Sequence, residues 1–477
     1  MKLSEIFKFK YLLYFAILFL FFFAGFAFNL LKPYPYKELA EIYFNFKINI
    51  NKITNYENEN IDSQLNIEEE INNINQLLSS TKTIESMVLP LEIKKYDLTK
   101  IYSNIEKTGG ICSQNNNIIF LNNKAQLFIF NHITKEIKLK KNLLTYINSI
   151  SDDEFIINDI LCKETEIQNN IFFYVSINIR NEDLYNQYIL EFKIKNEKIE
   201  DFKTLWKFKK TKKNNAGRII LDKNNHFYIS FTDHTDNPTK LKIEEIDSQN
   251  LSKLEGKIIK IDLFNKIEKV YSLGHRQVQG LFIDKRNNIF ATEHGPKGGD
   301  EFNLISENKN YGWPLSSHGV DYSSYEPIYG SYGRHDKFQK PIFSWNPGIG
   351  ISQLIRLNKF HEFWNDDFLI SSLKNKTLYR TRINSFNSVE FVEEIFIGNR
   401  LRDIIQFENK LYLWTDEGIL VEISILDLKD RYNPDYNSVL ISACLSCHHI
   451  GVTNSTHAAP SLLNIFKRKA GSDPNFK

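Results

Sequence analysis

Gly274 to Pro314 reads GHRQVQGLFIDKRNNIFATEHGPKGGDEFNLISENKNYGWP, and this stretch contains the features that decide the fold. Two apolar segments around a turn rich in Asn and charged residues predict a β-hairpin over 279–295. The hairpin opens into a loop with glycines at 295, 298 and 299 and the acidic pair Asp300-Glu301. Glycines permit positive φ and leave carbonyls bare, and carboxylates are hard oxygen ligands, so the loop suits Ca²⁺. The alternative is a glycine-rich turn with solvated acids.

The same hairpin unit recurs elsewhere in the chain. Each copy has an apolar strand, a turn containing Asn or Lys, and an aromatic-rich strand that ends near Asp, Glu or His. The copies lie at 217–233, 279–295 and 402–418, with a weaker one at 111–130. Recurring hairpins predict a β-propeller, in which four-stranded blades surround a channel and the loops at the blade edges form the site. A β-sandwich with unrelated hairpins is the alternative.

Several ordered motifs between roughly residues 200 and 425 carry a resemblance to a known family. They include GHRxxQG from 274, TEHGPKGGDEFNLI from 292, NYGWP from 310 and NRLRD from 399. Together they resemble the soluble quinoprotein sugar dehydrogenases, the glucose/sorbosone or aldose sugar dehydrogenase group that uses pyrroloquinoline quinone (PQQ). The resemblance implies a mainly β fold, a six-bladed propeller, and oxidation of an aldose at its C1 hydroxyl by hydride transfer to PQQ. It does not indicate which sugar is the substrate.

PQQ carries three carboxylates, so its pocket needs several fixed positive charges. By the resemblance, Arg276, Lys374, Arg400 and Arg402 occupy the basic cofactor-binding positions, and Gln277 stands where the family has Asn. Arginine offers a rigid fork to a carboxylate, whereas lysine acts as a point charge. Read singly, each of these cations is an ordinary surface residue, and their order along the chain is what predicts a site.

The same matching implies two calcium regions. The backbone carbonyls of Gly295 and Pro296 would bind a catalytic Ca²⁺ that acts as a Lewis acid beside PQQ. Asp300, Glu301 and Tyr311 would belong to a structural calcium region that holds the loop rigid.

The position of the family's catalytic histidine is occupied by Asn214, three residues before Gly217. An asparagine amide cannot act as a general base near neutral pH. Three explanations remain open: another histidine (His226, His234 or His294) takes the proton, the local alignment is shifted, or sugar oxidation is lost. In the last case the propeller is an inactive binding or scaffold module attached to an electron-transfer haem unit. A pure electron-transfer protein with a structural propeller is a third possibility.

Residues 444–449 read CLSCHH, the attachment motif of c-type haem. Cys444 and Cys447 would bind the haem covalently, and His448 would be an axial iron ligand. Residues 441–477 therefore predict a short, incomplete α-helical cytochrome c unit that passes electrons to a downstream cytochrome or oxidase. The only methionines are Met1 and Met87, so the usual methionine ligand is missing and His449 and His457 are weak substitutes.

The amino-terminal region predicts export. Residues 11–28 are apolar and uncharged and follow three lysines, which favours a single-pass anchor over 1–32 in a bacterial inner membrane, with the body in the periplasm. A cleaved signal peptide is the alternative. Apolar residues at helical spacing predict a helical stalk over 33–95, followed by the propeller at 96–425 and a linker at 426–440. The residues at that spacing are Ile61, Leu65, Ile71, Ile74 and Leu78.

Charge and cysteine content add two expectations. Of the 477 residues, 60 are Lys or Arg and 58 are Asp or Glu, and the net charge of +2 gives no reason to expect nucleic-acid binding. Cys112 and Cys162 stand alone in the sequence, so they could be a disulfide or two buried thiols, and we expect thiols.

Overall fold

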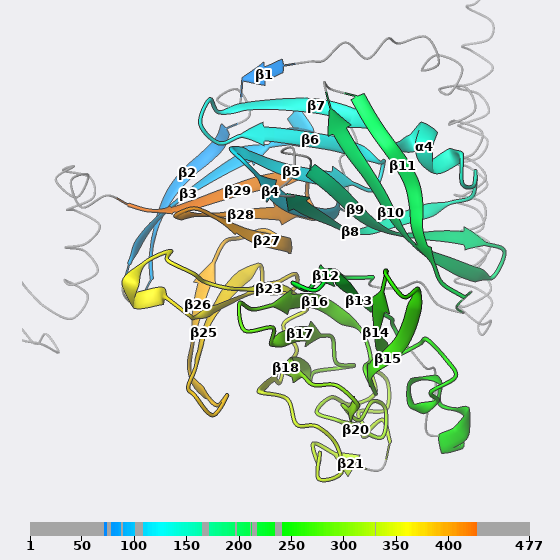
Figure 1. Cartoon of the computed structure of the whole chain (residues 1–477). Coiled ribbons are helices and arrows are strands. Elements are labelled where there is room, and N and C mark those ends of the chain that lie inside the picture. The colour runs from blue at the N-terminus through cyan, green and yellow to red at the C-terminus, as the bar shows by residue number, and fades with distance from the viewer. Residues whose placement is uncertain are drawn as a thin grey trace, which may run out of the picture. The chain divides into compact units, whose positions relative to one another are not determined.

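The structure is a computed structural model that describes residues 71–73, 78–86, 89–100, 108–164, 171–195, 198–209, 211, 217–233, 241–329 and 331–426. The expected anchor, almost all of the expected linker and the expected cytochrome c unit lie outside these ranges. Within them, no helix is both long enough and apolar enough to cross a membrane. The described residues form a mainly β, six-bladed propeller (Figure 1).

The first three blades are mainly antiparallel sheets. From its outer to its inner strand, blade 1 consists of β1 (Ile71–Asn73), β7 (Glu136–Asn142), β6 (Gln126–Asn131), β5 (Asn117–Asn122) and β4 (Thr108–Gln114). In the same direction, blade 2 consists of β11 (Lys198–Lys207), β10 (Leu184–Lys195), β9 (Ile171–Asn181) and β8 (Phe155–Glu164). Blade 3 extends from inner β12 (Ile219–Leu221) through β13 (His226–Ser230), β14 (Lys257–Asp262) and β15 (Ile267–Leu273) to outer β19 (Lys309–Asn310), which pairs parallel with β15.

The other three blades also extend from an inner strand outward. Blade 4 consists of β16 (Val278–Ile283), β17 (Ile289–Glu293), β18 (Asp300–Ile305) and β22 (Phe343–Trp345). Blade 5 consists of β23 (Ile351–Arg356), β24 (Phe368–Ser372), β25 (Thr377–Ile383) and β26 (Val389–Phe396). Blade 6 consists of β27 (Leu401–Phe407), β28 (Lys410–Thr415), β29 (Ile419–Ile425), β3 (Pro90–Asp97) and β2 (Leu78–Glu85).

A few short elements complete the described chain. The strands β20 (Ser316–Ser317) and β21 (Ser331–Tyr332) form a separate parallel pair. The helical elements are α4 (Leu144–Asn148), η1 (Leu98–Lys100), η3 (Ile243–Glu245), η4 (Asp247–Gln249) and η5 (Glu362–Trp364).

The inner strands of neighbouring blades contact one another around a ring, in the order β4, β8, β12, β16, β23, β27 and back to β4. Each hairpin unit found in the sequence supplies an inner strand and the strand next to it, so the four hairpin predictions are confirmed. Asn115, Asn225 and Asn287 occupy the turns of three of them with φ of 46°, 64° and 64°. Asparagine tolerates this left-handed conformation better than most residues, which is why these turns contain it.

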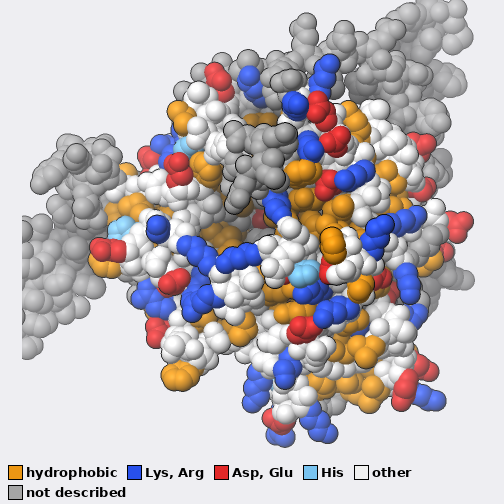
Figure 2. Space-filling model, viewed as in Figure 1, with side chains coloured by type: hydrophobic (Ala, Val, Ile, Leu, Met, Phe, Trp, Pro, Cys, Tyr) orange, Lys and Arg blue, Asp and Glu red, His pale blue; other side chains and the backbone are white. Residues whose placement is uncertain are grey.

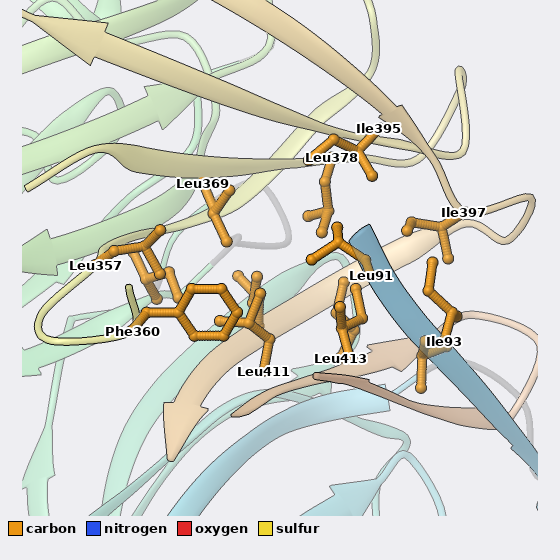
Figure 3. Packing of buried hydrophobic residues seen from close by; sticks show 14 of the residues in the cluster. Leu91, Ile93, Leu357, Phe360, Leu369, Leu378, Ile395, Ile397, Leu411 and Leu413 are labelled. Carbon is orange, nitrogen blue, oxygen red and sulfur yellow. The ribbon is translucent and has the colours of Figure 1, made fainter. Parts of the chain in front are cut away.

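Blade 6 is completed by strands from distant parts of the chain. Strand β3 pairs antiparallel with β29, with Ile93 opposite Ile423, and Figure 1 shows β2 and β3 beside β28 and β29. Apolar side chains from β3, β28 and blade 5 pack together in the core seen in Figure 3, among them Leu91, Leu413 and Leu378. The expectation of a helical stalk over 33–95 is therefore wrong for the described residues 71–73, 78–85 and 90–95, which lie in strands.

The two isolated cysteines are joined. Cys112 of β4 and Cys162 of β8 form a disulfide with a Cα–Cα distance of 5.7 Å, so the expectation of two thiols is wrong. No sequence pattern indicated this pairing, because 50 residues separate the two cysteines and only the ring of blades makes β4 and β8 neighbours.

Both signs of charge are spread over the face seen in Figure 2, with hydrophobic side chains between them.

Candidate functional site

Arg218 ties four of the six inner strands together inside the channel. It is 2 % exposed, and its Nη1 donates to Asp403 of β27 at 2.8 Å and to Asp159 of β8 at 3.2 Å. Its Nε donates to the carbonyl of Gln279 in β16 at 2.7 Å, and its Nη2 donates to the carbonyl of Arg402 at 3.0 Å. Arg218 thus fixes the backbone that carries two residues of the candidate site. Arg218 lies in the hairpin unit at 217–233, but sequence reasoning gave it no role.

The two ends of the channel differ in chemistry. A cavity of about 710 Å³ lies at one end, lined mainly by apolar residues of the inner strands such as Ile160, Leu281 and Ile404. At the other end, the inner strands begin and the cationic side chains expected from the sequence gather. We place the candidate site at this second end, because a binding site for a multiply charged anion needs fixed cations rather than an apolar wall.

Arg276 lies at this end, just before β16. Its Nη1 donates to the carbonyl of His294 at 3.3 Å, its backbone N–H donates to Glu293 at 3.0 Å, and its guanidinium lies 5.3 Å from the ring centre of Trp313. Its Nε is buried and has no hydrogen-bond partner among the described residues. Burial lowers the pKa of Arg276, but an arginine starts so high that the side chain stays charged.

Arg400 and Arg402 are held by a single carboxylate. Asp416, in the turn between β28 and β29, accepts from Nε of Arg402 at 2.8 Å, from Nη2 of Arg402 at 3.0 Å and from Nε of Arg400 at 3.1 Å. Nη1 of Arg402 also lies 3.4 Å from Oε1 of Gln279. One carboxylate therefore orients two guanidinium groups, while the neighbouring Glu417 accepts from the backbone N–H of Arg400 at 3.0 Å. Sequence reasoning missed Asp416, which stands in an ordinary-looking turn.

Lys374 and Gln277 complete the cations and amide predicted from the resemblance. Nζ of Lys374 donates to the carbonyl of Gly348 at 2.9 Å, and the neighbouring carbonyl of Leu373 accepts from Nη1 of Arg400 at 3.5 Å. The carbonyl of Gln277 accepts from the backbone N–H of His294 at 2.9 Å. Arg400 therefore contacts the residue before Lys374, and the backbone of Gln277 contacts the loop after β17.

His294 follows β17 and lies between the cationic residues. One side of its ring bonds to the backbone of Ile351, while its Nε2 is buried without a hydrogen-bond partner among the described residues. Burial is the largest cause that lowers the pKa of His294, to about 4; Asp300 opposes this shift, and Arg276 and Arg402 add to it. The imidazole is therefore neutral at pH 7, and its Nε2 is open to a ligand or a proton.

The glycine loop is packed backbone against backbone, as its composition suggested. Gly298 and Gly299 have φ of 87° and 73°. A Cβ on Gly295 would lie 2.1 Å from the carbonyl oxygen of Gly298, so this position excludes any side chain. The carbonyl of Pro296 accepts from the hydroxyl of Tyr322 at 3.0 Å.

Asp300 binds backbone groups of two segments. Oδ1 accepts from the N–H of Gly295 at 3.1 Å, and Oδ2 accepts from the N–H of Gly350 at 2.6 Å and of Ile351 at 3.0 Å. These bonds join the glycine loop of blade 4 to the start of β23. Its role as a calcium ligand stays a prediction.

Tyr311 and Glu301 differ in what they offer a cation. The hydroxyl of Tyr311 donates to the carbonyl of Leu304 at 2.6 Å and accepts from the N–H of Ser306 at 2.9 Å, so it serves the backbone. Glu301 is buried beside two histidines, His318 and His335, which sequence reasoning missed. A cavity of about 10 Å³ also lies between Glu301, Arg276 and their neighbours, room for about one water molecule or ion.

The histidines proposed as substitutes for Asn214 differ in where they lie relative to the cationic end of the channel. His226 binds Asp222 at 2.9 Å in a blade 3 turn that lines another part of the surface, away from the cationic end. His294 lies within the site. Asn214 and His234 lie outside the described residues, as do Cys444, Cys447 and His448.

Comparison with known proteins gives several relatives. The chain is 30% identical over 243 residues to the uncharacterised protein slr1608 of Synechocystis, covering 46% of this chain and 59% of that protein. It is 28% identical over 253 residues to the aldose sugar dehydrogenase YliI of Escherichia coli, covering 48% and 65%. It is 23% identical over 322 residues to quinoprotein glucose dehydrogenase B of Acinetobacter calcoaceticus, covering 60% and 65%. The matches span about three fifths to two thirds of these relatives.

Solved structures share the fold. The apo-form of the soluble aldose sugar dehydrogenase from Escherichia coli aligns with a TM-score of 0.57 and 20% identity, covering 70% of this chain and all of that one. The PQQ-bound aldose sugar dehydrogenase from Streptomyces coelicolor aligns with a TM-score of 0.50 and 18% identity, covering 73% and 98%. Residues 114–422 match the glucose/sorbosone dehydrogenase family, and the chain therefore belongs to that family.

Proposed function

We propose that this protein is a PQQ-dependent sugar dehydrogenase that oxidises the C1 hydroxyl of an aldose. The observation that carries the proposal is the gathering of Arg276, Arg400, Arg402 and Lys374 at one end of the channel, where the buried Nε of Arg276 has no hydrogen-bond partner among the described residues. When bound, PQQ supplies a two-electron acceptor for the hydride of the sugar.

The residues of the site fit such a cofactor. The Nε of Arg276 and the Nε2 of His294 are both buried, and neither has a hydrogen-bond partner among the described residues. Unpartnered buried polar atoms are costly, and an anion with several carboxylates would satisfy the arginine. Asp416 holds Arg400 and Arg402 in fixed orientations, so little side-chain entropy is lost on binding. The carbonyls of Gly295 and Pro296 are our proposed Ca²⁺ ligands beside the cofactor.

His294 is our candidate for the group that takes the sugar hydroxyl proton. Its Nε2 has no hydrogen-bond partner within the described ranges, and its ring orientation is set by the bond to the Ile351 backbone. Its pKa is too low for an efficient base in the protein alone, but a bound anion would raise it by favouring the imidazolium. Asn214 would then need no catalytic role, because a different residue supplies the base.

The direct test is to add PQQ and Ca²⁺ to the purified protein and to measure PQQ binding by absorbance and dye reduction with a panel of aldoses. Arg402→Ala should weaken PQQ binding by about 1.5–3 kcal/mol, the scale of a charge-assisted hydrogen bond. Arg382→Ala is the matched control, because Arg382 binds Asp367 within blade 5. Equal PQQ affinity of the wild type and Arg402→Ala would refute the cofactor site.

The same assay distinguishes the alternative function. His294→Gln should keep PQQ binding but lower the oxidation rate by about 10²–10⁴-fold, the usual contribution of a positioned base. If Asn214→His instead creates activity in a protein that binds PQQ but is otherwise inactive, the base is missing in the natural chain. An inactive wild type that binds PQQ would favour the scaffold module.

We also propose that the protein is exported, anchored in the inner membrane and fused to a c-type haem that receives the electrons. Residues 11–28 and the CLSCHH motif support this, and the Cys112–Cys162 disulfide is typical of an oxidising compartment such as the periplasm. In a host that matures c-type cytochromes, the denatured protein should retain haem absorbance, and Cys447→Ser should lose it. A wild-type chain without covalent haem would refute this part alone.

A further inference from the structure

Glu301, His318 and His335 place three potential metal ligands in one cluster. Glu301 lies on β18, whereas His318 and His335 lie in the long segment between β18 and β22. The ligand atoms of the three side chains all lie within 4.8 Å of one another. Nδ1 of His318 is 3.3 Å from Oε1 of Glu301, and Nε2 of His335 is 3.8 Å from the same oxygen. The two imidazoles are stacked with their centres 4.6 Å apart.

The orientation of His335 is fixed by its neighbour. The hydroxyl of Ser316 donates to the carbonyl of Arg334 at 2.7 Å, so its oxygen is left to accept from Nδ1 of His335, 3.2 Å away. The proton of the neutral ring is therefore on Nδ1, and Nε2 carries the lone pair. This Nε2 is buried and makes no hydrogen bond to any described residue, and it faces Glu301.

Glu301 is also oriented. Nδ2 of Asn303 donates to Oε2 of Glu301 at 3.2 Å and to Oε1 of Glu293 at 2.9 Å. One carboxylate oxygen is thus anchored, and the other faces the two histidines. Outer hydrogen bonds that set the tautomer of a histidine and hold a carboxylate are typical of metal sites.

We propose that Glu301, His318 and His335 bind a divalent transition-metal ion, with Zn²⁺ as the best match. Two nitrogens and one carboxylate oxygen are a zinc ligand set with a position left for water, whereas Ca²⁺ prefers six to eight oxygens. Ligands about 2.0–2.1 Å from a tetrahedral ion lie about 3.3 Å from each other. The separation of His318 from Glu301 already has this value, and His335 is within about half an ångström of it.

The ion would fasten the segment that contains β20 and β21 to β18. It would also compete with the structural calcium that the family resemblance places at Glu301, because a single carboxylate oxygen faces the histidines. The inference does not depend on PQQ binding or on sugar oxidation, so either can fail alone.

The test uses Co²⁺ as a spectroscopic substitute in the complete chain after treatment with a chelator. The wild type should bind one equivalent of Co²⁺ with the visible bands of a four-coordinate ion, Zn²⁺ should displace it, and an equal excess of Ca²⁺ should not. His335→Gln and His318→Gln should each lose that equivalent. His226→Gln is the matched control, because His226 also pairs with carboxylates but belongs to no group of three potential metal ligands within the described part of the chain.

A further variant tests orientation separately from ligation. Ser316→Ala should bind Co²⁺ about 10–100-fold more weakly, the usual effect of removing an outer-shell partner. Circular dichroism confirms that each variant is folded, and Zn²⁺ should raise the melting temperature of the wild type but not of the two histidine variants. Equal Co²⁺ binding by wild type and folded histidine variants, or displacement of Co²⁺ by Ca²⁺, would overturn the proposal.

Discussion

Replacing Arg218 by alanine should be among the most destabilising single changes in the propeller. The substitution leaves Asp159 and Asp403 buried beside each other without their cation, and it removes the donors to the carbonyls of Gln279 and Arg402. Breaking a buried ion pair by removing one partner costs about 3–5 kcal/mol, because the remaining buried charge loses its opposite charge. We expect a loss of this size in the free energy of unfolding.

The measurement is urea denaturation followed by tryptophan fluorescence, with Trp364 and Trp414 as buried reporters. Lys269→Ala is the control, because Lys269 and Glu307 form an exposed pair with 52% and 42% of their side chains accessible. Such surface pairs contribute about 0–1 kcal/mol. The control should therefore remain near the wild-type value.

A compensated variant tests the cause. Arg218→Met combined with Asp159→Asn and Asp403→Asn removes all three charges, and it should recover most of the stability lost in Arg218→Ala. A loss below about 1 kcal/mol in Arg218→Ala, or no recovery in the triple variant, would refute the role assigned to the buried charges.

Three further predictions concern stability. Cys112→Ser with Cys162→Ser should lower the free energy of unfolding by about 2–4 kcal/mol, since the disulfide closes a loop of 50 residues, and no change on reduction of the wild type would contradict this. Burial is the largest cause that raises the pKa of Asp159, to about 7 in the folded protein, above its unfolded value of about 3.9. The contribution of Asp159 to the free energy of unfolding is therefore fully present below about pH 4 and is lost as pH rises through 7. The stability of the wild type relative to Asp159→Asn should therefore fall between pH 4 and 7.5, and a constant difference would contradict the shift. Gly299→Ala should lower the melting temperature more than Gly333→Ala does, although both glycines have positive φ. A Cβ on Gly299 would lie 2.4 Å from the backbone N of Gly319, whereas a Cβ on Gly333 would meet its nearest atom at 3.5 Å.

The sequence predicted the blades because each hairpin is local. An inner strand, its turn and the next strand lie within about 17 residues, and alternating apolar residues with a turn residue such as Asn287 define them. The strands β2 and β3 were not predicted, since β3 pairs with β29, which lies more than 300 residues away, and β2 joins this sheet only through β3. The polar composition of this region and the helical spacing of its apolar residues, such as Ile71 in β1 and Leu78 in β2, favoured a helix. Tertiary pairing decided the outcome there.

The candidate site was predictable only in part. Arg276, Arg400 and Arg402 were found through ordered motifs, and the structure brings them to one end of the channel. The links between blades had no sequence signal, because Arg218 and its carboxylates come from three different blades. His318 and His335 were missed for another reason: they lie in a segment of irregular structure, which has no periodicity to interpret.

The pairing of β3 with β29 sets an order of events during synthesis. Strands β2 and β3 leave the ribosome before all the strands of blades 2 to 5, yet β29, with which β3 pairs, is complete only when residue 425 has been made. At usual rates of translation the interval is on the order of tens of seconds. During that time the edge of β3 that later pairs with β29 exposes unpaired backbone groups, which can pair with other chains. The ring therefore cannot close as it is synthesised, and a nascent chain interrupted before β29 would be a target for chaperones or proteases.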